Sequence, residues 1–158
     1  MQSAAVGTHA STVLYENLVN MFSRVDPASI ANSIWLANST TIPQLSTLVV
    51  PGGLAGSHVP VMSDASGSFK ILTRDVLFSE KLPALGARGD IMLVDLAKYE
   101  ILLGLDVSLE KSGHVGFVSD TSHFRGIVRA DGQSAWNAPR TPANGATLSP
   151  FVTLAART

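Results

Sequence analysis

One short motif in this sequence matches a known catalytic pattern. Ser108-Leu109-Glu110-Lys111 has the serine-x-x-lysine spacing of some acyl-transfer enzymes. That chemistry needs the serine at the start of a buried helix, with the lysine one turn later. Residues 105–110 instead alternate apolar and polar side chains, which predicts a half-buried strand. Ser108 and Lys111 then point to opposite faces, and we interpret the motif as structural.

The residue types that bind metals are scattered along the chain. The histidines are His9, His58, His114 and His123, and the chain has no cysteine. No two histidines lie four residues apart on a predicted helix, and no HExxH motif is present. Asp90 and Asp95 flank an apolar run, so we expect them on opposite faces of a strand, capping its two ends.

Two other patterns also favour structural interpretations. The Gly-rich segment 51–56 is neither a phosphate-binding loop nor a dinucleotide fingerprint, and it predicts a flexible surface loop. Asn38-Ser39-Thr40 is a formal glycosylation sequon that marks a turn from a strand to a helix. We therefore predict no catalytic residues, no metal and no cofactor, and hence a protein that is not an enzyme.

Composition indicates which kinds of partner to expect. Charged residues make up 15% of the chain and hydrophobic residues 46%, against roughly 25% charged in an average soluble domain. The surface is therefore rich in small polar residues, or part of it is normally buried against other chains. The net charge of -1 gives no reason to expect nucleic acid or an anionic membrane as a partner. No apolar run approaches the length of a membrane helix, and the first residues do not form a signal peptide.

Hydrophobic periodicity predicts an α+β fold. Apolar residues between Leu14 and Val25 recur at helical spacing and stop before Asp26-Pro27, which predicts one amphipathic helix. A brief helix is expected over residues 40–48, and a loop over 136–149. Strands are expected at 33–37, 59–62, 69–72, 75–79, 91–96, 99–103, 105–110, 124–130 and 151–155. Asp131-Gly132 is a strong turn pattern. We expect a flexible connector over residues 1–10 and a single globular unit over 11–158.

Four segments, in order, resemble the C-terminal half of tailed-phage major capsid proteins of the Hong-Kong-ninety-seven type. They are Asn32–Thr41 with its tryptophan strand, Ile71–Pro83, Gly89–Leu96 followed by Tyr99 and Ile101, and the set Phe117, Phe124-Arg125 and Arg129-Ala130-Asp131-Gly132. The resemblance covers about Val13 to Ala155. The chain departs from the family in three places: it lacks the usual glycine and proline near Thr73 and Asp75, it has Leu96 where an aromatic is common, and segment 136–149 is long.

The resemblance implies an axial domain, whose tips meet around the five-fold and six-fold axes of a shell, and a peripheral domain with a long helix and a sheet. This chain resembles the axial domain plus the returning strands of the peripheral domain. The N-terminal arm, extended loop and spine helix are then expected upstream, in a longer protein. The implied function is that of a structural subunit which assembles with copies of itself into pentamers and hexamers that enclose a genome. Its expected location is the virion, after assembly in the bacterial cytoplasm.

We expect two groups of residues at subunit interfaces. The first group, Gly52, Gly53, Gly56 and His58, belongs to a flexible loop over residues 51–67, which we expect near the symmetry axis. The second group is Arg125 and Arg129, which share a face with Ile127 on a strand expected to be half-buried. We expect both arginines to pair with carboxylates within or between subunits. Sequence-specific nucleic-acid binding is not expected.

Three alternatives remain open from the sequence. Encapsulin-type compartments share the same shell fold and differ in enclosing a protein cargo. A small hydrolase using Ser, His and Asp would need a titratable cluster in a cleft. A monomeric binding module would remain a monomer where a shell subunit assembles.

Overall fold

The computed structural model describes residues 2–3, 12–50, 60–65 and 67–157. The chain divides into two compact units, one formed by residues 1–97 with 136–158, and the other by residues 98–135. The expectation of a single globular unit over residues 11–158 stays a prediction. Among the described residues, the strands predicted between residues 99 and 130 form a two-stranded sheet of their own.

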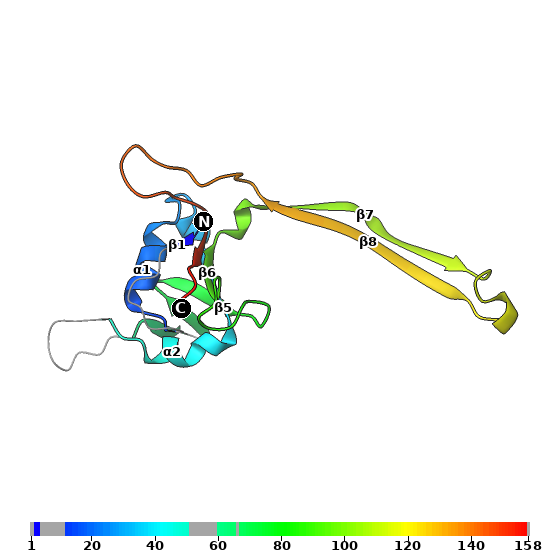
Figure 1. Cartoon of the computed structure of the whole chain (residues 1–158), viewed down its shortest axis with the longest axis horizontal. Helices are drawn as coiled ribbons and strands as arrows, with labels where there is room; N and C mark the ends of the chain where they lie inside the picture. Colours follow the sequence, from blue (N-terminus) through cyan, green and yellow to red (C-terminus); the bar gives the residue numbers. More distant parts are fainter. Residues whose placement is uncertain (1, 4–11, 51–59, 66, 158) are drawn as a thin grey trace. The chain divides into compact units, whose positions relative to one another are not determined.

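The larger unit is built on a mixed seven-stranded sheet of order β1-β9-β6-β2-β5-β4-β3 (Figure 1). Its strands are β1 (Gln2–Ser3), β2 (Ile34–Ala37), β3 (Met62–Ala65), β4 (Ser68–Ile71), β5 (Arg74–Phe78), β6 (Ile91–Val94) and β9 (Phe151–Leu154). The pairs β1–β9 and β2–β5 are parallel, and the other neighbours are antiparallel. The predicted mixture of helix and strand is confirmed.

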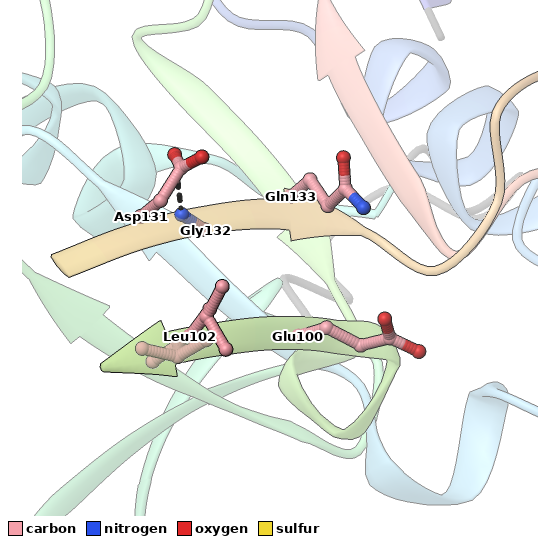
Figure 2. Close-up of a pocket in the computed structure, with 6 residues that line it drawn as sticks. Glu100, Leu102, Asp131, Gly132 and Gln133 are labelled. Atoms are coloured by element: carbon pink, nitrogen blue, oxygen red, sulfur yellow. Dashed lines mark hydrogen bonds between the residues drawn. The ribbon is translucent and has the colours of Figure 1, made fainter. Parts of the chain in front are cut away.

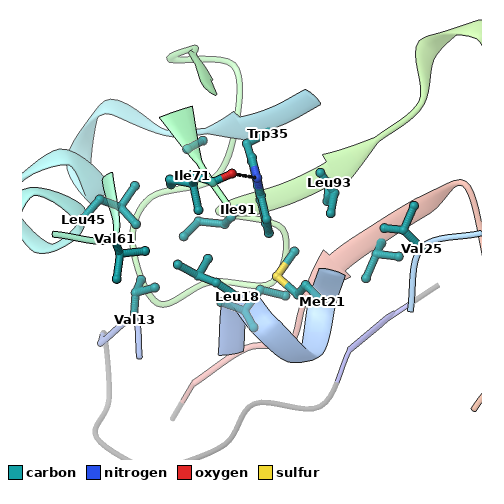
Figure 3. Close-up of a cluster of buried hydrophobic side chains, with 13 residues drawn as sticks. Val13, Leu18, Met21, Val25, Trp35, Leu45, Val61, Ile71, Ile91 and Leu93 are labelled. Atoms are coloured by element: carbon teal, nitrogen blue, oxygen red, sulfur yellow. Dashed lines mark hydrogen bonds between the residues drawn. The ribbon is translucent and has the colours of Figure 1, made fainter. Parts of the chain in front are cut away.

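Helix α1 (Tyr15–Ser23) forms where the apolar period predicted a helix. Leu18 and Met21 lie one turn apart and are fully buried, and Figure 3 shows both side chains directed toward the sheet residues Trp35 and Leu93. Helix α2 (Ile42–Thr47) contributes Leu45 to the same buried cluster. None of the described helices is long and apolar enough to cross a membrane.

Strand β2 supplies the centre of this core. Trp35 is fully buried, and its indole Nε1 donates a hydrogen bond of 2.9 Å to the carbonyl oxygen of Ile71 (Figure 3). The strand ends at Asn38, whose side-chain oxygen accepts a hydrogen bond of 2.9 Å from the Thr40 amide. A 3-10 turn (Ser39–Thr41) follows and leads into α2. The predicted turn from strand to helix is thus confirmed.

The two consecutive hairpins of the sheet differ in their turns. In the first, β3 occupies residues that we had expected in the turn, and only residues 66–67 separate β3 from β4. The second joins β4 to β5 through Leu72 and Thr73, both with positive φ, at 47° and 68°. That conformation normally favours glycine or asparagine. Leu72 packs against the core, which offsets part of the backbone strain.

A buried ion pair fastens the end of the chain to the loop before β6. Asp90 and the Arg157 side chain are buried, and the Arg157 guanidinium pairs with the Asp90 carboxylate. Asp90 also accepts a hydrogen bond of 2.9 Å from the Gly86 amide, and the Arg157 amide donates one of 2.9 Å to the Gly86 carbonyl oxygen. At the other end of β6, Asp95 accepts a hydrogen bond of 3.0 Å from the Ala97 amide. Both carboxylates therefore cap the strand, as predicted.

The smaller unit is a two-stranded antiparallel hairpin of β7 (Tyr99–Ser112) and β8 (His123–Ser134), which run side by side in Figure 1. The strands expected at 99–103 and 105–110 are one continuous strand. The turn expected at Asp131-Gly132 is wrong, because these residues pair with Leu102 and Ile101 inside the ladder. A Cβ atom at Gly132 would lie 2.6 Å from the Tyr99 hydroxyl oxygen, so a larger residue there would require the Tyr99 side chain to shift.

Candidate assembly surface

The pairing register sorts the hairpin side chains onto two faces. Ile101 lies opposite Gly132, Leu103 opposite Ala130, and Lys111 opposite Phe124. The pairing register shifts between Leu103 and Ser108, so the side chains of β7 change face there. The side chains of β8 alternate between the two faces throughout. One face, which we call the apolar face, carries Tyr99, Ile101, Leu103, Val107, Leu109, Phe124 and Val128. The opposite, polar face carries Glu100, Ser108, Glu110, Ser112, His123, Arg125, Arg129, Asp131 and Gln133, together with Leu102 and Ile127.

The apolar face is exposed to solvent. Leu103 is 68% exposed, Leu109 72% and Phe124 65%. The half-buried strand that we expected at 105–110 is therefore wrong, because residues 107–110 are exposed. Contiguous apolar surface of this kind marks an interaction site in a soluble protein.

The distal end of the hairpin extends this apolar character. Residues 113–122 connect the strands through a 3-10 turn (Phe117–Ser119), which ends at Asp120 with a φ of 50°. Val115, Phe117 and Val118 are all exposed there, and Val118 fully so. Apolar side chains at an exposed turn are unusual, since connecting segments are normally polar.

The polar face holds the two arginines that we predicted at an interface. Arg125, Ile127 and Arg129 share this face, as expected, but both arginines are exposed rather than half-buried. The Arg125 guanidinium pairs with the Glu110 carboxylate across the strands at 2.5 Å, which confirms a carboxylate partner for Arg125 within the chain. Arg129 has no ion pair with any residue that the structure describes. An intersubunit role for either side chain stays a prediction.

Near the start of the hairpin, the polar face contains an open hollow of about 290 Å³. Figure 2 shows Glu100 and Leu102 on β7 beside Asp131 and Gln133 on β8. Both carboxylates are exposed, and the described residues contain no group of three metal-ligating side chains. The hollow therefore presents the hydrogen-bonding groups of Glu100, Asp131 and Gln133 to solvent.

Among the residues that the structure describes, the other candidates for chemistry do not converge on a site. Ser108 pairs with Ile127 on the polar face and Lys111 with Phe124 on the apolar face, which confirms that the serine-x-x-lysine motif is split between two faces. The Lys111 ammonium lies 5.8 Å from the centre of the Phe124 ring. His9 and His58 fall outside the described residues.

Residues 51–59 of the loop that we expected near a symmetry axis lie outside the described residues, and residues 62–65 of it form β3. Gly52, Gly53, Gly56 and His58 all belong to it, and their interface role stays a prediction. The apolar face was missed at the sequence level, although its pattern was present in the alternation of Tyr99, Ile101 and Leu103 and of Phe124 and Val128. We had interpreted only the alternation of residues 105–110, as a half-buried strand.

Solved capsid structures share this fold. The capsid of an empty GTA particle computed with C5 symmetry matches with a TM-score of 0.62 and 16% identity, over 98% of this chain and 50% of that one. The capsid of a native GTA particle computed with C5 symmetry matches with a TM-score of 0.61 and 18% identity, over 98% and 49%. This chain thus spans about half the length of the capsid chains that it matches.

Sequence comparison identifies the family directly. No curated protein sequence matches the chain. The model of the phage capsid family matches residues 1–138, which is most of the chain and includes the whole hairpin. The likeness to the capsid structures extends over the remaining sheet strand as well. The chain therefore belongs to the phage capsid family and has the Hong-Kong-ninety-seven-type capsid fold.

Proposed function

We propose that this chain is part of a structural subunit of an icosahedral bacteriophage capsid, which assembles with copies of itself into pentamers and hexamers that enclose the genome. Its location is then the virion, with assembly in the cytoplasm of the bacterial host. The observation that carries the proposal is the exposed apolar face of the β7–β8 hairpin, in a chain of the phage capsid family.

A hairpin with such a face is suited to burial in a larger assembly. An isolated two-stranded hairpin is marginally stable in water and needs a further layer. Burying one leucine or phenylalanine side chain contributes about 1.5–3 kcal/mol. Permanent protein interfaces are also more apolar than free surface. Low overall charge, at 15% of residues, fits a subunit that hides much of its surface.

We assign the two units different places in the subunit. The larger unit corresponds to the axial domain, and the β7–β8 hairpin to the returning strands of the peripheral domain. The loop containing Gly52, Gly53, Gly56 and His58 lies near the symmetry axis in this proposal. In the same proposal, Arg125 and Arg129 on the polar face pair with carboxylates of neighbouring subunits.

The test compares two double variants of strand β7. Each variant adds two negative charges to one face of the strand. Leu103→Asp with Leu109→Asp puts both on the apolar face, where assembly would have to bury them without partners. Burying an unpaired charge costs several kcal/mol, so we expect shells to be lost. The matched control, Ser108→Asp with Ser112→Asp, adds the same charge to the polar face of the same strand. Electron microscopy and sedimentation of the assembled protein measure the shell yield, and circular dichroism checks the fold.

Two outcomes would count against the proposal. If both double variants form shells in equal yield, the apolar face is not buried in the assembly. If the unaltered protein remains monomeric under conditions in which capsid proteins assemble, the shell function itself is wrong. A binding module would then explain the exposed face better.

A further inference from the structure

The main sheet has helices on one face only among the described residues. Leu18 and Met21 of α1 and Leu45 of α2 belong to the single buried cluster on that face, with Trp35 and Leu93 (Figure 3). The opposite face, which we call the outer sheet face, carries the alternate residues of each strand. Pairing places four of these in one row across β9, β6, β2 and β5: Thr153, Met92, Leu36 and Leu77.

Leu77 is the most exposed part of this row. It is 58% exposed, the largest value for a large hydrophobic side chain among the described residues of the larger unit, while Leu36 and Met92 are partly exposed. In the next row, Lys70 pairs with Asp75 at 3.4 Å, with side chains 39% and 62% exposed. Such an exposed pair contributes little to stability, so Lys70 is free to take another carboxylate partner.

A second surface lies on the other side of the unit, on helix α1. Tyr15, Glu16, Val19 and Asn20 line a hollow of about 320 Å³. Glu16, Val19 and Asn20 lie on the side of α1 away from Leu18 and Met21, because the two sets are about half a turn apart on the helix. Tyr15, at the edge of the hollow, also packs against the core. Val19 is partly exposed there, and Glu16 supplies a carboxylate.

We propose that the outer sheet face of one copy packs against the α1 hollow of the next copy, with Leu77 inserted beside Val19 and Lys70 facing Glu16. The inference rests on the proposed function and specifies which surfaces meet within a ring of subunits. A closed ring joins two different surfaces of each copy in the same way at every contact. The larger unit presents these two on its opposite sides, one on the sheet layer and one on the helix layer. Their exposed apolar side chains and opposite charges are complementary.

Disulfide cross-linking tests the contact directly, because the chain has no cysteine of its own. Val19→Cys and Leu77→Cys are introduced together into the assembling protein, the particles are oxidised, and the products are separated without reductant. A contact between residue 19 of one copy and residue 77 of the next gives a ladder that ends at five or six linked copies. The pair Val19→Cys with Asn144→Cys, in which the second cysteine lies on an exposed loop, is the matched control and should give no ladder.

The single variants separate this arrangement from a symmetric one. Val19→Cys alone and Leu77→Cys alone should give no covalent dimer, and a mixture of the two should stop at dimers. A dimer from either single variant would show that like surfaces meet, and would overturn the inference. If the double variant does not assemble, the pair Glu16→Cys with Lys70→Cys tests the same contact at its polar edge.

The experiment can reject this contact without rejecting the proposed function. Shells without any cross-link from either cysteine pair would reject this contact and leave the shell function standing. An unaltered protein that forms neither rings nor shells would reject both.

Discussion

Strands β6 and β7 have similar apolar residues and opposite surroundings. Ile91 and Leu93 on β6 are fully buried by their own unit, whereas Leu103 and Leu109 on β7 are 68% and 72% exposed. β6 is a continuous apolar run and residues 105–110 of β7 alternate, but neither pattern indicates which layer covers the apolar side chains. The difference lies in whether the chain itself supplies a second layer.

The two arginine–carboxylate pairs show the same contrast. Arg157 and Asp90 pair where both side chains are buried in the larger unit, and Arg125 and Glu110 pair on the exposed polar face of the hairpin. A pair that is buried cannot exchange one partner for water, while an exposed pair can. The same substitution should therefore change the free energy of unfolding much more in the larger unit than in the hairpin.

The largest expected effect on the stability of the folded chain is that of Trp35→Ala. This change leaves a cavity at the centre of the core and removes the hydrogen bond to the Ile71 carbonyl oxygen, so we expect a loss of about 3–5 kcal/mol in the free energy of unfolding. Leu109→Ala in the hairpin should change it by less than about 0.5 kcal/mol, because the side chain is exposed. Urea denaturation of the unassembled protein measures both. Equal losses would show that the hairpin is covered in the unassembled chain too.

A somewhat smaller effect is expected from Arg157→Met. It leaves the Asp90 carboxylate buried without its cation, which costs about 3 kcal/mol. Arg125→Met is the matched change on the hairpin and should cost less than about 1 kcal/mol. Adding Asp90→Asn to Arg157→Met should recover part of the loss, since the buried charge is then gone. Thermal unfolding of the four proteins gives the comparison, and similar losses for both arginine variants would contradict it.

The smallest expected effect is a gain in stability. Thr73 has a φ of 68°, where a residue with a Cβ costs about 1–2 kcal/mol. Thr73→Gly removes that strain and loosens the unfolded chain, for an expected net gain of about 0.5–1 kcal/mol. Leu72→Gly relieves similar strain but removes a side chain packed on the core, so no gain is expected. Denaturation midpoints of the two variants measure both changes in stability. A lower stability of Thr73→Gly would contradict the prediction, because the contacts of the Thr73 side chain would then stabilise the fold by more than the backbone strain costs.

The spacing of apolar residues along the sequence predicted most helices and strands of the larger unit. The helical spacing of Leu18 and Met21 located α1, and the short apolar runs located β2, β6 and β9 within one or two residues. The resemblance to capsid proteins, based on segments such as the tryptophan strand, also identified the family correctly. The turn predicted at Asp131-Gly132 was wrong, because both residues pair with β7 inside the ladder.

The sequence by itself determined the helix and strand periods, the apolar side of each strand and the family, because these depend on neighbouring residues and on the order of motifs. Only the tertiary structure decided that Asp90 meets Arg157 across 67 positions and that the apolar face of β7 and β8 remains uncovered within the described chain. Pairing between distant residues and the presence of a covering layer depend on how the elements pack. A strand carries the same alternation whether its partner layer comes from its own chain or from another.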